Sequence, residues 1–201
     1  MSLDEVKVFG NNKQNKLLLE CFSREKCPQA WLIYGDKGLG KFFSINKLVN
    51  TYKQKNPLSS ILVLNENENQ SNIEDIRLII SQLSLTNNSR INDKTFVLID
   101  NADQMSFNSH NALLKTLEEP PKNTLIILIV HNFKKIPKTV ISRCSLVKFE
   151  RLSFLEFKHF IKENFEKYPP NMEEIFKVTN GFPKYINLFK NEDGEKIKEI
   201  T

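Results

Sequence analysis

The chain has 201 residues, of which 40% are hydrophobic and 26% charged, a composition typical of a globular protein with a substantial core. Its net charge of +5 is compatible with a nearby phosphate backbone, but no basic stripe interleaved with aromatic residues predicts direct reading of a DNA sequence. No apolar run reaches the roughly 18 residues of a membrane-spanning helix, and the first ten residues lack the apolar block of a signal peptide. We therefore expect a cytoplasmic protein without a membrane partner.

The cysteines do not predict a structural site. There are three, at Cys21, Cys27 and Cys144, and no two of them have the Cys-x-x-Cys spacing. Neither a disulfide framework nor a four-cysteine zinc site is therefore supported. We expect reduced thiols, as is usual in the cytosol, and no bound metal.

Apolar runs alternate with helix-like stretches over the first 150 residues, a pattern typical of a parallel sheet with crossover helices. The apolar runs predict five strands, at residues 30–34, 61–64, 95–99, 125–130 and 146–149. The fourth run is uninterrupted for six residues, which favours a central strand covered on both faces.

Helical spacing predicts helices at residues 41–55 and 73–83. A further helix is expected to begin after Ser106 as N-cap and to end before Pro120-Pro121, because proline cannot continue a helix. The side chains that we expect this helix to bury are Phe107, Leu113, Leu114 and Leu117.

After Glu150 the pattern changes to helices alone. One is marked by apolar residues from Phe154 to Phe165, a second by residues from Met172 to Val178, and a third opens at Gly181-Phe182-Pro183. We therefore expect an α/β domain of the nucleotide-binding type at residues 1–150 and a small helical lid at residues 151–195.

The segment from Gly35 to Lys41 follows the first expected strand and opens a helix. It reads Gly-Asp-Lys-Gly-Leu-Gly-Lys and fits the phosphate-loop pattern G-x-x-x-x-G-K. Glycines at Gly35, Gly38 and Gly40 let backbone N–H groups surround a phosphate, and Lys41 would meet the terminal phosphates at the helix N-terminus.

Two positions argue against ATP hydrolysis. After Lys41 the pattern needs a serine or threonine hydroxyl for Mg²⁺, but the residue is Phe42, whose ring cannot bind a hard cation. Ser44 comes two residues after Phe42 and points roughly 200° round the helix axis from it, so the Ser44 hydroxyl cannot take the place of the missing one.

The second position follows Asp100, which closes the third strand; we expect this strand to lie beside the phosphate-loop strand. This arrangement resembles the AAA+ ATPases, which place a glutamate next to polarise the attacking water. Here the residue is Asn101, and an amide is no useful base. Two interpretations stay open: Lys41 only ties down its own loop, or weak ATP or ADP binding persists without hydrolysis.

Further segments carry a closer likeness. The run Asn111 to Pro121 (Asn-Ala-Leu-Leu-Lys-Thr-Leu-Glu-Glu-Pro-Pro) and the segment Ile141-Ser142-Arg143-Cys144 resemble the clamp-loader subunits of bacterial DNA polymerase III, as do residues 30–32 and 73–77. The likeness covers roughly residues 5 to 190. It implies an AAA+ fold with a five-stranded parallel sheet, flanking helices and a helical lid.

Within this family, tau/gamma motor subunits keep the hydroxyl and the glutamate, whereas delta-prime subunits tolerate their loss. Phe42 and Asn101 therefore resemble the delta-prime type. The resemblance implies that Arg143 is an arginine finger, which reaches the γ-phosphate bound by a neighbouring subunit; the alternative is an ordinary surface or ion-paired arginine. It also suggests polar sensors near His131-Asn132 and Lys184, although exposed polar residues explain both positions equally well.

The chain departs from the family in two respects. Residues 50–60 contain no cysteine, so the family's small zinc module is expected to be absent. The sequence also ends at Thr201, so we expect the C-terminal collar domain that joins such subunits into a pentamer to be absent, either because the sequence is a fragment or because the protein is naturally short.

The sequence therefore favours a subunit that does not hydrolyse ATP itself. The partners that the resemblance implies are tau/gamma subunits, the delta subunit, the beta clamp and primer-template DNA. Two alternatives are an active AAA+ ATPase motor of the tau/gamma type and a stand-alone degenerate nucleotide-binding module.

Overall fold

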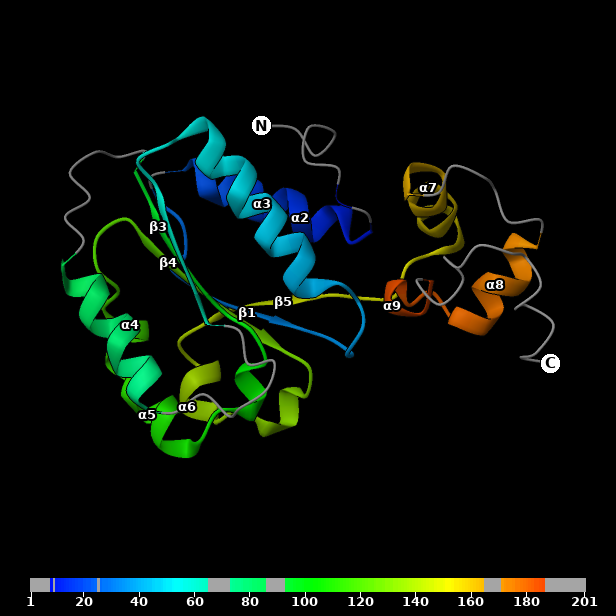
Figure 1. Cartoon of the computed structure of the whole chain (residues 1–201). Coiled ribbons are helices and arrows are strands. Elements are labelled where there is room, and N and C mark those ends of the chain that lie inside the picture. Colours follow the sequence, from blue (N-terminus) through cyan, green and yellow to red (C-terminus); the bar gives the residue numbers. More distant parts are fainter. Residues whose placement is uncertain are drawn as a thin grey trace.

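The computed structural model describes residues 8, 10–24, 26–64, 73–85, 93–164 and 171–186. Five strands form one parallel sheet in the order β2-β3-β4-β1-β5, with helices on both faces (Figure 1). The strands are β1 (Ala30–Tyr34), β2 (Ser60–Leu64), β3 (Thr95–Ile99), β4 (Thr124–Val130) and β5 (Ser145–Lys148). The predicted fold class and all five predicted strands are confirmed.

Strand β4 is the central strand, as its apolar run predicted. All seven of its residues are buried, and it pairs with β3 on one side and β1 on the other. The expectation that β3 lies beside the phosphate-loop strand β1 is therefore wrong, because β4 lies between them. A strand that is apolar along its whole length is best buried on both faces, and only a strand inside the sheet, with a neighbour on each edge, is buried in this way. The longest apolar run therefore forms the central strand.

Alternate side chains of the sheet enter two separate cores. Trp31 and Ile33 of β1 join the core under α2 (Asn12–Ser23) and α3 (Lys41–Lys55), whereas Leu32 joins the opposite core. That opposite core lies under α4 (Ile73–Leu85), α5 (Phe107–Glu118) and α6 (Lys138–Ile141). The alternation follows from the two-residue period of a strand.

Helix α2 was not predicted. Its first turn is polar, and its buried apolar residues, Leu18, Leu19 and Phe22, gather in its second half. Phe22 follows Leu18 by four residues and Leu19 by three, which is helical spacing, but the stretch is too short to stand out from sequence alone.

Helix α5 confirms the predicted N-cap but corrects one core residue. The Ser106 hydroxyl accepts a hydrogen bond from the backbone N–H of Ser109 at 3.1 Å. Leu113 and Leu117 are buried, but Phe107 is 68% exposed, so the prediction that it is buried is wrong. Phe107 lies one helical turn before the buried His110, on the same side of α5, but its ring is in solvent. Periodicity shows which residues share a side of a helix, but it does not show how far along the helix that side is covered by other elements.

The C-terminal helices have a core of their own. They are α7 (Phe154–Asn164), α8 (Met172–Thr179) and α9 (Pro183–Ile186). Leu152, Phe157, Ile161 and Ile175 are buried together there, and the rings of Phe157 and Phe176 meet edge to face. The predicted Phe165 and the end of the expected lid, residues 187–195, lie outside the described residues, and the boundary at residue 150 stays a prediction. Across the described ranges, no helix is both long and apolar enough to cross a membrane.

Gly181 lies between α8 and α9, where its backbone comes close to the backbone of Leu152. Its φ is +72°, and its carbonyl accepts a hydrogen bond from the backbone N–H of Leu152 at 2.9 Å. A Cβ at this position would overlap the backbone carbonyl of Leu152. At Gly40, with a φ of +74°, a Cβ would meet no described atom within 4 Å.

We therefore expect Gly181→Ala to destabilise the chain more than Gly40→Ala. Both substitutions place an alanine in the left-handed region, which costs about 1–2 kcal/mol. Only Gly181→Ala adds a clash, for which we expect at least about 1 kcal/mol more. Unfolding in urea measures both variants, and equal losses of stability would show that the Leu152 contact is unimportant.

Candidate functional site

The phosphate loop lies at the carboxyl edge of the sheet, between β1 and α3. Its three glycines all have positive φ, +152° at Gly35, +95° at Gly38 and +74° at Gly40. Residues with a side chain rarely adopt these angles, so the glycine spacing serves the backbone turn itself. The loop that the sequence predicts is therefore present as a strand–turn–helix.

Lys41 is bound to its own loop. Its side chain is 2% exposed, and its Nζ donates hydrogen bonds to the carbonyl oxygens of Gly35 at 2.7 Å and Asp36 at 2.8 Å. Burial lowers the pKa of Lys41 from 10.5 to about 8, although Asp100, Asp103 and Asp36 oppose the shift. These contacts are those expected if Lys41 ties down the loop.

The position after Lys41 contributes to the core. The Phe42 ring is half-buried and packs against the cluster under α2 and α3. Ser44 is buried one turn into the helix. Mg²⁺ takes oxygen ligands, so this donor set does not fit the metal that ATP hydrolysis needs. Within the described part of the chain, no three His, Cys, Asp or Glu side chains come together as a possible metal cluster.

Asp100 and Asn101 follow β3 at the same edge. Asp100 is buried; burial raises the pKa of its carboxyl above the usual range, against the hydrogen bond from Asn101 and the charge of Lys41. The Asn101 backbone N–H donates to Asp100 Oδ1 at 3.0 Å. Asn101 is left-handed, with φ 54°, a conformation that asparagine tolerates better than most residues do. Its buried amide is no general base.

Asp103 is a site residue that the sequence interpretation missed. It lies in η1 (Ala102–Gln104), a single 3₁₀ turn, and is 7% exposed. Its two carboxylate oxygens accept hydrogen bonds from the backbone N–H groups of His131 at 2.8 Å and Asn132 at 3.1 Å. It thereby clamps the end of β4. The sequence indicates only that an acidic residue follows Asp100 by three positions. It does not indicate that this residue binds the backbone at His131 and Asn132.

His131 stands where the resemblance suggests a sensor. Burial, together with the charge of Lys41, lowers the pKa of His131 to about 4, so the imidazole is neutral at physiological pH. Its buried Nδ1 has no hydrogen-bond partner among the described residues. The side chain therefore has hydrogen-bonding capacity left beside the phosphate loop, while its role as a sensor stays a prediction.

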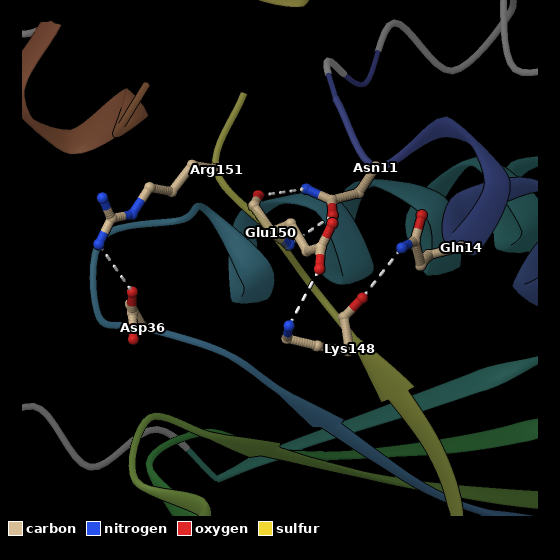
Figure 2. A network of polar contacts seen from close by, with 6 residues as sticks. All are labelled: Asn11, Gln14, Asp36, Lys148, Glu150 and Arg151. Atoms are coloured by element: carbon tan, nitrogen blue, oxygen red, sulfur yellow. Dashed lines mark hydrogen bonds and ion pairs between the residues drawn. The ribbon is translucent and has the colours of Figure 1, made fainter. Parts of the chain in front are cut away.

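The base of the helical lid lies across the phosphate loop. The backbone N–H of Lys184, in α9, donates to the Gly38 carbonyl at 3.2 Å, and Figure 1 shows α9 beside the turn between β1 and α3. Arg151 forms an ion pair with Asp36 at 3.5 Å, as Figure 2 shows, and its guanidinium lies 4.5 Å from the Phe182 ring centre. The lid therefore contacts the loop through both backbone and side chains.

A second set of contacts ties the start of α2 to the same connection (Figure 2). Asn11 donates to the Glu150 carbonyl at 3.0 Å and accepts from the Glu150 backbone N–H at 2.7 Å. Gln14 donates to the Lys148 carbonyl at 3.0 Å. These bonds fix the chain where it leaves β5 and enters the lid.

Arg143 lies at the opposite edge of the sheet. It precedes β5, whose first residue, Ser145, pairs with Trp31, whereas the last, Lys148, pairs with Tyr34 beside the phosphate loop. Arg143 and this chain's own phosphate loop are therefore separated by the length of β5. The side chain is 31% exposed, so it is at the surface.

The Arg143 guanidinium has partners within the chain. Its Nη1 donates to the Thr139 carbonyl at 3.0 Å and to the Ser142 hydroxyl at 3.4 Å. Its Nε and Nη2 approach Glu118 Oε2 at 3.4 and 3.3 Å. An exposed ion pair of this kind contributes about 0–1 kcal/mol, so it is easily exchanged. Beside it, burial raises the pKa of the Cys144 thiol to about 12, which leaves Cys144 protonated and unsuited to nucleophilic attack.

Comparison with known proteins identifies relatives over most of the chain. Residues 10–153 match the protein family described as DNA polymerase III, delta subunit. DNA polymerase III subunit gamma of Buchnera aphidicola subsp. Schizaphis graminum is 31% identical over 195 residues, 88% of this chain and 53% of that protein. Subunit delta' of Bacillus subtilis is 26% identical over 89% of this chain and 59% of its own length.

A solved structure supports the fold. A gamma subunit-related protein of DNA polymerase III from Thermotoga maritima superposes with a TM-score of 0.62 at 19% identity, over 93% of this chain and 60% of that one. The sheet and its flanking helices therefore have the predicted AAA+ fold. The chain spans about half the length of the curated relatives it matches.

The buried Lys41 predicts how stability changes with pH. Its pKa is about 8 in the folded chain, against 10.5 ordinarily, so between these values the unfolded chain binds the extra proton. Stability from this group therefore increases as pH rises above 8. From pH 7 to pH 9, the wild-type chain should gain about 1 kcal/mol of unfolding free energy relative to Lys41→Met.

Urea unfolding of the two proteins at each pH tests this expectation. Groups such as Lys94, whose pKa burial also lowers, are present in both proteins and cancel in the difference. A difference that stays constant from pH 7 to pH 9 would contradict the burial of a charged Lys41.

Proposed function

The chain belongs to the DNA polymerase III delta subunit family, and we propose that it is a delta-prime-type clamp-loader subunit that does not hydrolyse ATP. In this role it completes the ATP site of a neighbouring tau/gamma subunit with Arg143. The other proposed partners are the delta subunit, the beta clamp and primer-template DNA. The observation that carries the proposal is the contrast between the two edges of the sheet: a phosphate loop without its catalytic groups, and a surface arginine at the far edge.

At the carboxyl edge, the groups for hydrolysis are missing. Phe42 replaces the metal-binding hydroxyl, and Asn101 stands where a water-activating glutamate is needed. Loss of a general base alone reduces a rate by roughly 10²–10⁴-fold. Lys41 already donates to two loop carbonyls, so a phosphate would have to displace these bonds. We infer that no nucleotide is required for the subunit's role, and that any ATP or ADP binding is weak.

At the amino edge, Arg143 has a chemistry suited to a phosphate. The guanidinium is permanently charged and planar, and its Nε and Nη2 face Glu118 through an exposed pair at 3.3–3.4 Å. Such a pair is worth about 0–1 kcal/mol, whereas an arginine finger contributes roughly 10³–10⁵ to the rate, or about 4–7 kcal/mol. The phosphate of a neighbour would therefore displace Glu118. The anchor on the Thr139 carbonyl would hold the guanidinium in place.

Two alternatives remain distinct from this proposal. An active motor of the tau/gamma type would hydrolyse ATP as an isolated chain, and Lys41→Ala would abolish that turnover. A stand-alone degenerate nucleotide-binding module would not co-purify with tau/gamma or delta subunits.

We expect Arg143→Ala to reduce the DNA-stimulated ATPase of a reconstituted clamp loader by at least tenfold, because the stabilising charge on the neighbour's phosphate is lost. Arg143→Lys should recover only part of the rate, since an ammonium lacks the planar fork. Stability of the isolated chain should change by less than about 1 kcal/mol, because the ion pair is exposed.

Glu118→Gln is the matched control for this experiment. It breaks the same ion pair but leaves the guanidinium in place, so the ATPase should be retained. If Glu118→Gln lowers the rate as much as Arg143→Ala does, the ion pair has a structural role and the finger is refuted.

We also expect the isolated chain to show no ATP turnover above that of a Lys41→Ala variant. Release of phosphate from ATP and Mg²⁺ measures this directly. Turnover that Lys41→Ala removes would favour the active-motor alternative.

A further inference from the structure

A cavity of about 560 Å³ opens at the amino edge of the sheet, away from the phosphate loop. It lies between the segment before β1 and the beginnings of β3 and β4. Its described lining includes Gln29, Thr124 and four cationic residues, Arg24, Lys26, Lys94 and Lys122, and none of the described lining residues is acidic. Its volume is in the range of small-molecule sites.

Lys94 is the buried cation of this cavity. It is 6% exposed, and its Nζ donates to the Arg24 carbonyl at 2.9 Å. Across the described residues, its ammonium has no carboxylate partner. A buried charge is normally paired, because removing it from water without a counter-charge is unfavourable. The cavity is therefore a place where an anion would be stabilised.

Thr124 is a further polar residue of the described lining, and its hydroxyl oxygen is itself closed to solvent. The residue is fully buried, and its Oγ1 finds no hydrogen-bond partner among the described residues. Leaving a buried polar group unpaired costs about 1–3 kcal/mol. Nearby, Gln29 Nε2 donates to the carbonyls of Pro121 at 3.2 Å and Thr124 at 3.1 Å, which holds this lining side chain against the start of β4.

The remaining cations stand at the rim. Lys26 and Lys122 are exposed, while Arg24 forms an exposed ion pair with Glu20 at 3.1 Å. Glu20 thus offsets one of the four charges, and the lining residues that the structure describes keep an excess of positive charge. Exposed lysines alone would indicate only a solvated surface. Together with the buried ammonium of Lys94, they make the cavity electrostatically favourable for a ligand with several charged oxygens.

We propose that this cavity binds phosphoryl groups, as a site separate from the phosphate loop. The two sites lie at opposite ends of β1, roughly 16 Å apart for five residues at about 3.3 Å each. The proposal therefore does not depend on the proposed function. The phosphoryl group belongs either to a free small phosphate or to the backbone of a nucleic acid.

Trp31 provides a signal for binding. It is the only tryptophan in the chain, and its Nε1 donates to the Pro28 carbonyl at 2.7 Å, between the lining residues Cys27 and Gln29. Titration of the full chain with inorganic pyrophosphate at about 0.15 M ionic strength, where distant charges are screened, should give a saturable change in tryptophan fluorescence.

The variants assign that change to the cavity. K26A/K122A should weaken pyrophosphate binding at least tenfold, and Lys94→Met should do the same. K162A/K177A removes the same charge from two exposed lysines of the lid and should change binding less than twofold. Loss of binding in Lys41→Ala alone, equal losses in both lysine pairs, or no saturation would each overturn the proposal.

A second titration separates the two sources of phosphate. A short fluorescein-labelled single-stranded oligonucleotide is followed by anisotropy with the same variants. Weaker oligonucleotide binding by K26A/K122A, but not by K162A/K177A, would identify a nucleic-acid backbone as the ligand. Pyrophosphate binding with no such difference would identify a free small phosphate.

Discussion

The chemistry of this chain depends on strand β4 being buried on both faces and hydrogen-bonded along both edges. Its pairing places Leu128 opposite Ile99 and Val130 opposite Tyr34, so Asp100 and the phosphate loop reach the same edge of the sheet. The carboxylate of Asp103 then clamps the backbone where β4 ends. A polar residue in the middle of β4 would disturb both neighbouring strands, and with them every group at this edge.

Local signals in the sequence predicted most of the elements. The apolar runs predicted the five strands. Ser106 and the glycines of the phosphate loop were also readable, because the Ser106 hydroxyl itself caps the helix and the glycines themselves adopt the positive φ angles of the turn. The order of the strands was not accessible in this way, because it depends on pairing between residues far apart in the chain. Phe107 shows a related limit: its spacing suits the buried stripe of α5, yet coverage of a stripe depends on what packs against it.

In the candidate site, too, features set by residue type could be predicted, whereas contacts between residues far apart in the chain could not. The missing hydroxyl at Phe42 and the amide at Asn101 can be read from single positions, since they depend on residue type alone. That Lys41 ties down its own loop was one of the two interpretations that the sequence left open, whereas the contacts of Asp36 could not be predicted. The ion pair of Asp36 with Arg151 joins residues 115 positions apart, and Lys184 reaches the loop through its backbone, which carries no sequence signal.

The two edges of the sheet differ in how readily their polar contacts can change. At the carboxyl edge, Lys41 and Asp103 are buried, and breaking their hydrogen bonds would leave unsatisfied groups at about 1–3 kcal/mol each. At the amino edge, the pair of Arg143 with Glu118 is exposed and weak, and can be exchanged for another partner at little cost. The polar contacts are thus fixed at the edge that holds the phosphate loop and adaptable at the edge where, in the proposed function, a neighbour's phosphate would meet Arg143. This difference explains how an ATPase fold can keep its phosphate loop as a structural element while a single surface arginine carries the proposed function.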